Sequence, residues 1–175
     1  MTPDDFKNLW LRVSAQFQCG PGSIHGPAHW QRVEQHGLVL AAKTGADITV
    51  VRLFALFHDA QRVNESVDHG HGMRGAELAA SLRGAEFDIP DPAFAVLQAA
   101  CAGHTDRQHA ADPTIGTCWD ADRLDLGRVG IRPDERFMST ALGRELARRG
   151  PTPPVSRGRA ERIGSNGGKK RGTAS

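Results

Sequence analysis

The stretch Val50-Val51-Arg52-Leu53-Phe54-Ala55-Leu56-Phe57-His58-Asp59 is the most hydrophobic in the chain, and it ends on two polar side chains. Its first eight residues are apolar on nearly every side of a helix, which predicts a central helix buried by its neighbours. A buried polar group without a partner costs about 2–7 kcal/mol. A bound divalent metal ion would offset that cost, so His58 and Asp59 form the first candidate site.

Helical periodicity also dominates on both sides of this stretch, and no convincing alternating strand is present. Capping residues, glycines and prolines divide the chain into seven expected helices. These run from Pro3 to Phe17, from Pro27 to Gly45, from a cap at Asp47 or Thr49 to Phe57, from the end of the 61–70 loop to near Gly84, from Asp91 to His104, around Trp119 to Leu126, and from Pro133 to near Gly150. We therefore predict an all-α fold, a single helical domain of six or seven helices over residues 1–150.

Residues 151–175 differ in composition from the rest of the chain. They are rich in Pro, Gly, Ser and Arg, and Val155 and Ile163 are their only large apolar residues. Such a segment buries too little surface to offset its ordering entropy, so we predict a disordered tail. It carries a net charge of +5 within an overall charge of +2, which leaves −3 for residues 1–150. A basic tail of this kind is usually solvated, and it would give nucleic acid only a weak, salt-sensitive contact.

Length and composition exclude several classes of protein. The chain has 175 residues and no apolar run of about 18 or more, so we expect no membrane span. Residues 1–18 lack the basic and apolar layout of a signal peptide. Cys19, Cys101 and Cys118 are odd in number and far apart, which argues against a disulfide framework or a zinc ribbon. These features favour a cytoplasmic protein.

A histidine and an aspartate elsewhere in the chain could complete a set of metal ligands with His58 and Asp59. His29 lies in the first turn of the second expected helix, and Asp122 lies on the sixth. Two imidazoles and two carboxylates form a mixed nitrogen and oxygen set that suits a divalent ion such as Mn, Fe, Co or Ni, with Mg and Zn as further candidates. Adjacent helical residues point about 100° apart. His58 and Asp59 can therefore share an ion only at a frayed or distorted helix end.

The order of these residues resembles that of a known family. His25-Gly26-Pro27-Ala28-His29-Trp30-Gln31-Arg32-Val33, Phe57-His58-Asp59 and Asp120-Ala121-Asp122-Arg123-Leu124 are similar to the motifs of the HD superfamily of metal-dependent phosphohydrolases. The resemblance covers about residues 23–130 and implies that His29, His58, Asp59 and Asp122 bind the metal. It favours Asp122 over Asp120 as the metal ligand. We expect Asp120 and Asp125 to act as helix caps or salt-bridge partners. No second catalytic domain is visible, so the chain resembles a stand-alone form of the family.

The resemblance also implies roles in catalysis. A bound metal would lower the pKa of a water molecule and orient it at phosphorus, and Asp59 would help to take its proton. The histidines expected to stabilise phosphoryl charge or to protonate the leaving oxygen are His104, His71 and His25. Some members hold a second metal between the doublet and the last aspartate, where His71 and His104 fall. Ordinary hydrogen bonding at helix ends is the alternative for these histidines.

Three arginines are candidates for binding the substrate phosphate, because planar guanidinium donors suit phosphate oxygens. They are Arg32, Arg74 and Arg123, and each could instead pair with a buried aspartate. The sequence names no substrate, since no glycine-rich phosphate loop is present.

The expected function is metal-dependent hydrolysis of a phosphate ester, a monoester or a diester, in a small substrate for which we favour a nucleotide. Two other classes stay open. One is a di-metal oxygenase of the same superfamily, and the other is a non-catalytic module that binds a nucleotide or nucleic acid. The oligomeric state is also open.

Overall fold

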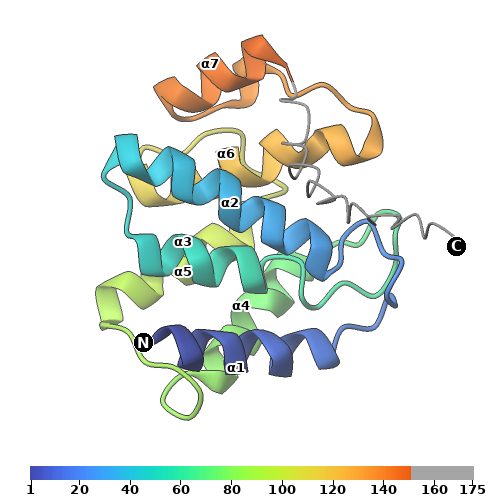
Figure 1. Cartoon of the computed structure of the whole chain (residues 1–175), viewed down its shortest axis with the longest axis vertical. Helices are drawn as coiled ribbons and strands as arrows, with labels where there is room; N and C mark the ends of the chain where they lie inside the picture. Colours follow the sequence, from blue (N-terminus) through green and yellow to red (C-terminus); the bar gives the residue numbers. More distant parts are fainter. Residues whose placement is uncertain (151–175) are drawn as a thin grey trace, which may run out of the picture.

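Seven α-helices and two short 3-10 helices make up residues 1–150, the part of the chain that this computed structural model describes. The predicted all-α fold is confirmed, while the predicted disordered tail, 151–175, lies outside the described residues. The helices are α1 (Pro3–Ala15), α2 (Pro27–Thr44), α3 (Ile48–Phe57), α4 (His71–Leu82), α5 (Asp91–Gly103), α6 (Pro113–Leu124), η1 (Asp125–Val129), η2 (Glu135–Phe137) and α7 (Ala141–Arg149). Figure 1 shows them stacked between α1 at one end and α7 at the other.

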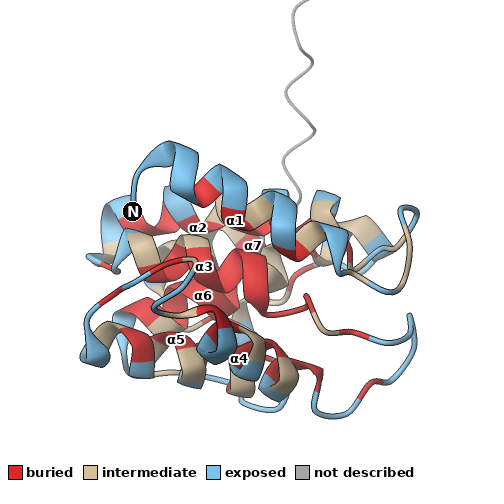
Figure 2. Cartoon of the chain, turned by 90° about the horizontal axis from the view of Figure 1, so that it is seen from below, coloured by how far each residue is buried: buried red, intermediate tan, exposed pale blue. Residues whose placement is uncertain are grey.

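The hydrophobic stretch forms α3, which is the central helix as predicted. The Asp47 side chain caps its first turn by accepting the N–H groups of Thr49 and Val50. Every residue from Leu53 to Phe57 is buried, and α1, α2, α4, α5 and α6 all pack against the helix. In Figure 2 most of α3 is drawn as buried, between helices whose outer faces are exposed. The end of α3, where His58 and Asp59 follow, is therefore held inside the protein.

Two glycines let α4 approach the neighbouring helices more closely than any other residue would. A Cβ atom at Gly75 would lie closer to the Phe57 carbonyl oxygen than real Cβ atoms come, and 3.3 Å from the His58 carbonyl oxygen. A Cβ atom at Gly72 would lie 2.9 Å from the His104 ring nitrogen Nδ1. The start of α4 is consequently pressed against the ends of both α3 and α5.

The last helix is shorter than its sequence pattern predicts. The pattern predicts a helix from Pro133, whereas η2 covers only Glu135–Phe137 and α7 begins at Ala141. The buried Asp120 carboxylate explains the difference, because it accepts the backbone N–H groups of Ser139 and Thr140 at 2.7 and 2.8 Å. These bonds hold the chain extended just before α7. Asp120 thus acts in the fold, as expected of a cap or bonding partner.

Two further sequence expectations concern membranes and cysteines. Among the described residues, no helix combines the length and the hydrophobicity needed to span a bilayer. Cys19, Cys101 and Cys118 are all free thiols.

Candidate metal centre

The four predicted metal ligands come together from three helices. His29 lies in the first turn of α2, His58 and Asp59 follow α3, and Asp122 lies near the end of α6. The His29 Nε2 atom is 3.1 Å from His58 Nε2, 3.2 Å from Asp122 Oδ1 and 3.6 Å from Asp59 Oδ2. The His58 Nε2 atom is 3.7 Å from Asp59 Oδ2 and 3.8 Å from Asp122 Oδ1. All four side chains therefore converge on one point.

A tight turn at the end of α3 allows two adjacent residues to face the same point. The regular helix stops at Phe57, and the N–H of Ala60 then bonds the Phe57 carbonyl three residues back, at 3.2 Å. This is the distorted helix end that the adjacency of His58 and Asp59 requires.

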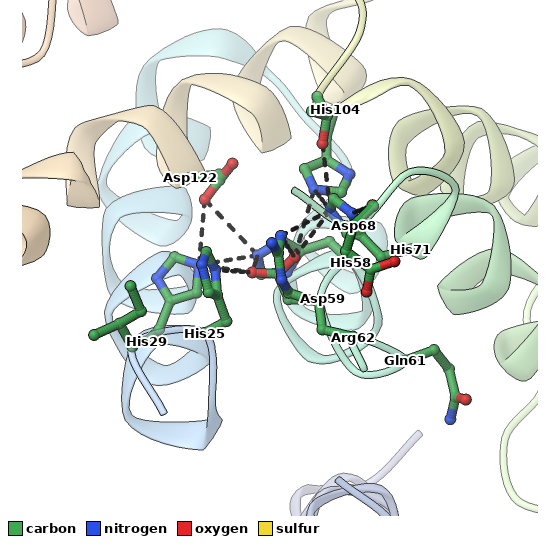
Figure 3. Close-up of polar contacts among 12 residues, drawn as sticks. His25, His29, His58, Asp59, Gln61, Arg62, Asp68, His71, His104 and Asp122 are labelled. Carbon is green, nitrogen blue, oxygen red and sulfur yellow. Dashed lines mark hydrogen bonds and ion pairs between the residues drawn. The ribbon is translucent and has the colours of Figure 1, made fainter. Parts of the chain in front are cut away.

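His71 and His104 form a second group beside the first. Their Nε2 atoms are 2.9 Å apart, and they lie 3.2 and 3.7 Å, respectively, from Asp59 Oδ1. The other oxygen of Asp59, Oδ2, faces His29 and His58. Figure 3 shows Asp59 in the middle, with His25 and His29 on one side and His71 and His104 on the other. One carboxylate thus connects two groups of potential ligands, each able to hold a metal ion.

The remaining ring nitrogen of each of the four histidines in the two groups is held by an acceptor. The Nδ1 atoms of His29, His58, His71 and His104 lie 2.6–3.1 Å from Asp125 Oδ2 and from the carbonyl oxygens of Ala55, Asp68 and Cys101, respectively. Since carbonyls and carboxylates only accept hydrogen bonds, each Nδ1 carries the proton. Each Nε2 atom then presents a lone pair that can bind a metal, in the arrangement that usually orients histidine ligands.

These atoms fit a metal ion better than they fit one another. Two neutral imidazoles cannot form a hydrogen bond when both present lone pairs, yet Nε2 atoms face each other at 3.1 and 2.9 Å. The Asp59 Oδ1 atom is also buried without a hydrogen-bond partner. A buried polar atom of this kind normally has a partner. Cations bound between the facing nitrogens and carboxylate oxygens would satisfy all of them.

The pKa shifts point in the same direction. Burial lowers the pKa of His58 to about 4, so its ring is neutral at pH 7 and able to bind a metal. Burial acts to raise the pKa of Asp59, but the surrounding histidines outweigh it and hold the pKa well below its usual range. Burial also acts to lower the pKa of His29, and its contacts with Asp122 and Asp125 outweigh this effect and raise it. The cluster therefore attracts positive charge, and bound metal would displace protons from it.

His25 lies at the edge of the cluster, as expected. It precedes α2, and its side chain is 15% exposed. Its Nδ1 atom is 3.0 Å from Asp59 Oδ2. This contact places His25 beside the candidate metal ligands and leaves its other ring nitrogen, Nε2, pointing away from Asp59 Oδ2.

The structure does not bring the three predicted phosphate-binding arginines to the cluster. Arg32 donates to Asp125 Oδ1 at 2.7 Å, and Arg74 donates to both oxygens of Asp68. Arg123 donates to backbone carbonyls, including those of residues 107, 108 and 137. Each of the three guanidinium groups thus has a structural partner, which is the alternative that the sequence left open.

Two arginines that sequence reasoning missed lie closer. Arg62 is only 7% exposed, and its Nη1 atom is 3.6 Å from Asp59 Oδ1 and 3.4 Å from His71 Nε2. Arg128 lies on the opposite side, with Nη2 3.4 Å from His25 Nδ1. Each follows a site aspartate by three residues, since Arg62 follows Asp59 and Arg128 follows Asp125. That spacing, close to one helical turn, is the signal that could have identified them.

Comparison with known proteins gives one similar structure. No protein-family model matches the chain, and no curated protein matches it. Among solved structures, the crystal structure of a predicted HD superfamily hydrolase from an uncultured Thermotogales bacterium is 26% identical, with a TM-score of 0.64. The match covers 82% of this chain and 83% of the other. The likeness therefore extends over most of both chains.

The sequence order, the cluster and the structural likeness agree with one another. His29, His58-Asp59 and Asp122 occur in the order that the resemblance requires; the first three form a buried group, and the partly exposed Asp122 lies 3.2 Å from His29. The fold around them is that of the Thermotogales protein over four fifths of the chain. In its motifs, its histidine and aspartate cluster and its fold, the chain is similar to a predicted hydrolase of the HD superfamily.

Proposed function

We propose that this protein is a metal-dependent hydrolase that cleaves a phosphate ester in a small molecule, and we favour a nucleotide as the substrate. The observation that carries the proposal is the Asp59 carboxylate, whose two oxygens face two groups of histidines. The similar Thermotogales structure, a predicted hydrolase, supports the reaction class.

The residues present would hold one or two divalent ions. His29, His58, Asp59 and Asp122 would bind the first, and Asp59 would also join His71 and His104 around a second. A divalent ion bound by such a set lowers the pKa of a coordinated water toward neutrality and supplies a nucleophile for attack at phosphorus. Mixed imidazole and carboxylate ligands suit Mn, Fe, Co, Ni, Zn or Mg, and metal analysis must identify the ion.

Two side chains of the cluster would handle the proton and the phosphoryl charge. His25 touches Asp59 through Nδ1, which leaves Nε2 to donate a proton to the leaving oxygen. The Nη1 atom of Arg62 would bind a phosphoryl oxygen, because it is the cationic group nearest to the His71 side of the centre. In this proposal Arg62 takes the role that the sequence assigned to Arg32, Arg74 and Arg123.

The test is a metal-reconstituted protein assayed against a panel of nucleotides and other phosphate esters. Phosphate release should depend on added metal and should fall at least about 100-fold in Asp59→Asn, as expected for loss of a metal ligand or its support. Asp88→Asn, on the exposed surface, is the matched control and should keep full activity. A protein that binds metal but releases phosphate from no member of the panel would refute the proposal.

A di-metal oxygenase is the second candidate, because the bridging position of Asp59 also suits a pair of iron ions. Metal analysis and oxygen consumption after anaerobic purification separate the two functions. One Mn, Co or Ni ion per chain without oxygen uptake would exclude the oxygenase.

A further inference from the structure

Two adjoining cavities form a groove that leads away from the metal centre. The nearer cavity has a volume of about 370 Å³ and the farther one about 610 Å³. Both are lined by Met73, Ala102 and Asp106, so they are continuous at these residues. Each volume lies within the range of about 300–1,000 Å³ that small-molecule sites occupy. The groove is therefore large enough for a substrate that is longer than a phosphate group.

The nearer cavity opens directly onto the His71 side of the centre. Arg62, His71 and Thr105 line it, and the Thr105 hydroxyl is 3.3 Å from His71 Nε2. A phosphoryl group bound at the metal would therefore lie at this end, beside the Arg62 guanidinium. Any part of the substrate attached to that phosphoryl group can extend only where space exists, and the nearer cavity supplies it.

The farther cavity has mainly apolar walls. Ala99, Ala102, Ile115 and Trp119 line it, and the polar side chains on its wall include Arg107 and Asp112. The Trp119 indole N–H already donates to the Ala100 carbonyl at 2.9 Å, so this ring needs no polar partner from a ligand. Trp119 is itself buried, and a Cβ atom at Gly103 would lie 2.9 Å from its Cζ2, so only glycine fits beside this edge of the ring.

Apolar side chains also flank the passage between the two cavities. Val67 and Met73 line the nearer cavity and are 72% and 52% exposed, respectively. Exposed apolar groups beside a polar site often mark the place where an apolar ligand is covered. The groove thus changes from polar and charged beside the centre to mainly apolar at its far end.

We infer that this groove is the subsite for the leaving group, and that it takes a planar aromatic group such as a nucleobase. The inference rests on the proposed hydrolase function and adds to it the side from which the substrate enters. A phosphate ester with a flat apolar group matches both ends of the groove, with its phosphate beside Arg62 and His71 and its ring between Ala99, Ala102 and Ile115, above the buried Trp119. The groove suits a small molecule because it is hollow and continuous with the metal centre.

The test compares a nucleoside 5′-monophosphate with ribose 5-phosphate, which has the same scissile bond but no base. The variant Ala99→Phe fills the farther cavity, and Ala80→Phe places the same ring on the exposed face of α4, away from both cavities. We expect Ala99→Phe to lower kcat/KM for the nucleotide at least about tenfold, as loss of an apolar pocket does. The value for ribose 5-phosphate should stay within about twofold, and Ala80→Phe should change neither.

Other outcomes would overturn the inference. Equal losses for both substrates, or no loss for either, would show that the groove does not bind the base. A wild-type dimer that Ala99→Phe converts to monomers, with the substrate ratio unchanged, would make the groove a contact between two copies.

If the wild type hydrolyses neither compound, that result counts against the proposed function. The subsite is then tested separately by a binding measurement. Metal-loaded protein should then still bind the nucleotide more tightly than ribose 5-phosphate, with a tryptophan fluorescence change that Trp119→Phe removes. Equal affinity for the two compounds would refute the subsite.

Discussion

Substituting Gly75 by alanine should disturb the metal centre, although Gly75 contacts no metal. The added Cβ would overlap the Phe57 carbonyl oxygen, and it would lie 3.2 Å from the Phe57 carbonyl carbon. These are backbone atoms immediately before His58-Asp59, so they cannot rotate away as a side chain would. The start of α4 must therefore move away from the end of α3, and His71 must move with it.

The expected magnitude combines two opposing effects. Overpacking a tight contact typically lowers the free energy of unfolding by about 1–3 kcal/mol. Replacing glycine by alanine within a helix raises it by about 1 kcal/mol. We expect a net loss of up to about 2 kcal/mol, which in a protein of this size lowers Tm by up to roughly 8 °C. Displacement of His71, now 3.2 Å from Asp59 Oδ1, should also weaken binding of the second metal.

Gly37→Ala is the matched control. Its Cβ would lie 2.5 Å from Val51 Cγ1, so the same substitution meets a side chain on α3 instead of the backbone at the doublet. Metal stoichiometry and thermal unfolding should be measured for both variants. Gly37→Ala should alter stability alone, whereas Gly75→Ala should alter stability and metal content. Wild-type metal content with a raised Tm in Gly75→Ala would refute the close-approach reasoning.

Three further predictions concern the support of the centre. Asp125→Ala removes the acceptor of His29 Nδ1, 2.7 Å away, and should weaken metal binding about 10–100-fold in a chelator competition assay. Asp120→Ala leaves the N–H groups of Ser139 and Thr140 without their acceptor. Each unsatisfied N–H group should lower the free energy of unfolding by about 1–3 kcal/mol in a denaturant titration. The metal affinity should stay unchanged. Chelation should lower Tm, and metal returned at 100 times its Kd should restore about 2.7 kcal/mol of stability.

The sequence predicts this fold well because its helices are strongly patterned. The apolar stretch before His58, the cap at Asp47 and the proline at residue 27 each mark an element that the structure contains. The seventh helix begins later in the structure than its pattern predicts, because hydrogen bonds to Asp120 hold residues 139 and 140 extended. A carboxylate about 20 residues away leaves no trace in the local periodicity.

The metal ligands could likewise be predicted from the sequence, whereas the roles of the residues around them depend on contacts in the fold. His29, His58-Asp59 and Asp122 are predictable because their identity and order are distinctive in the sequence. Arginine is a common residue, and its role depends on which carboxylate the folded structure places beside its guanidinium group. Arg32 looked suitable, but Asp125 binds its guanidinium at 2.7 Å.

Arg62 is different because the turn after α3 directs it inward. Its Nη2 atom is fixed by the Ser66 carbonyl at 2.7 Å, while Nη1 remains 3.6 Å from Asp59 Oδ1 and 3.4 Å from His71 Nε2. One end of the guanidinium is therefore anchored to the loop, and the other faces the metal centre. A cation held in this way does not replace a metal ligand, because it has no lone pair to offer. It can instead bind an anion that enters the centre, which is the basis of the phosphate-binding role proposed for Arg62.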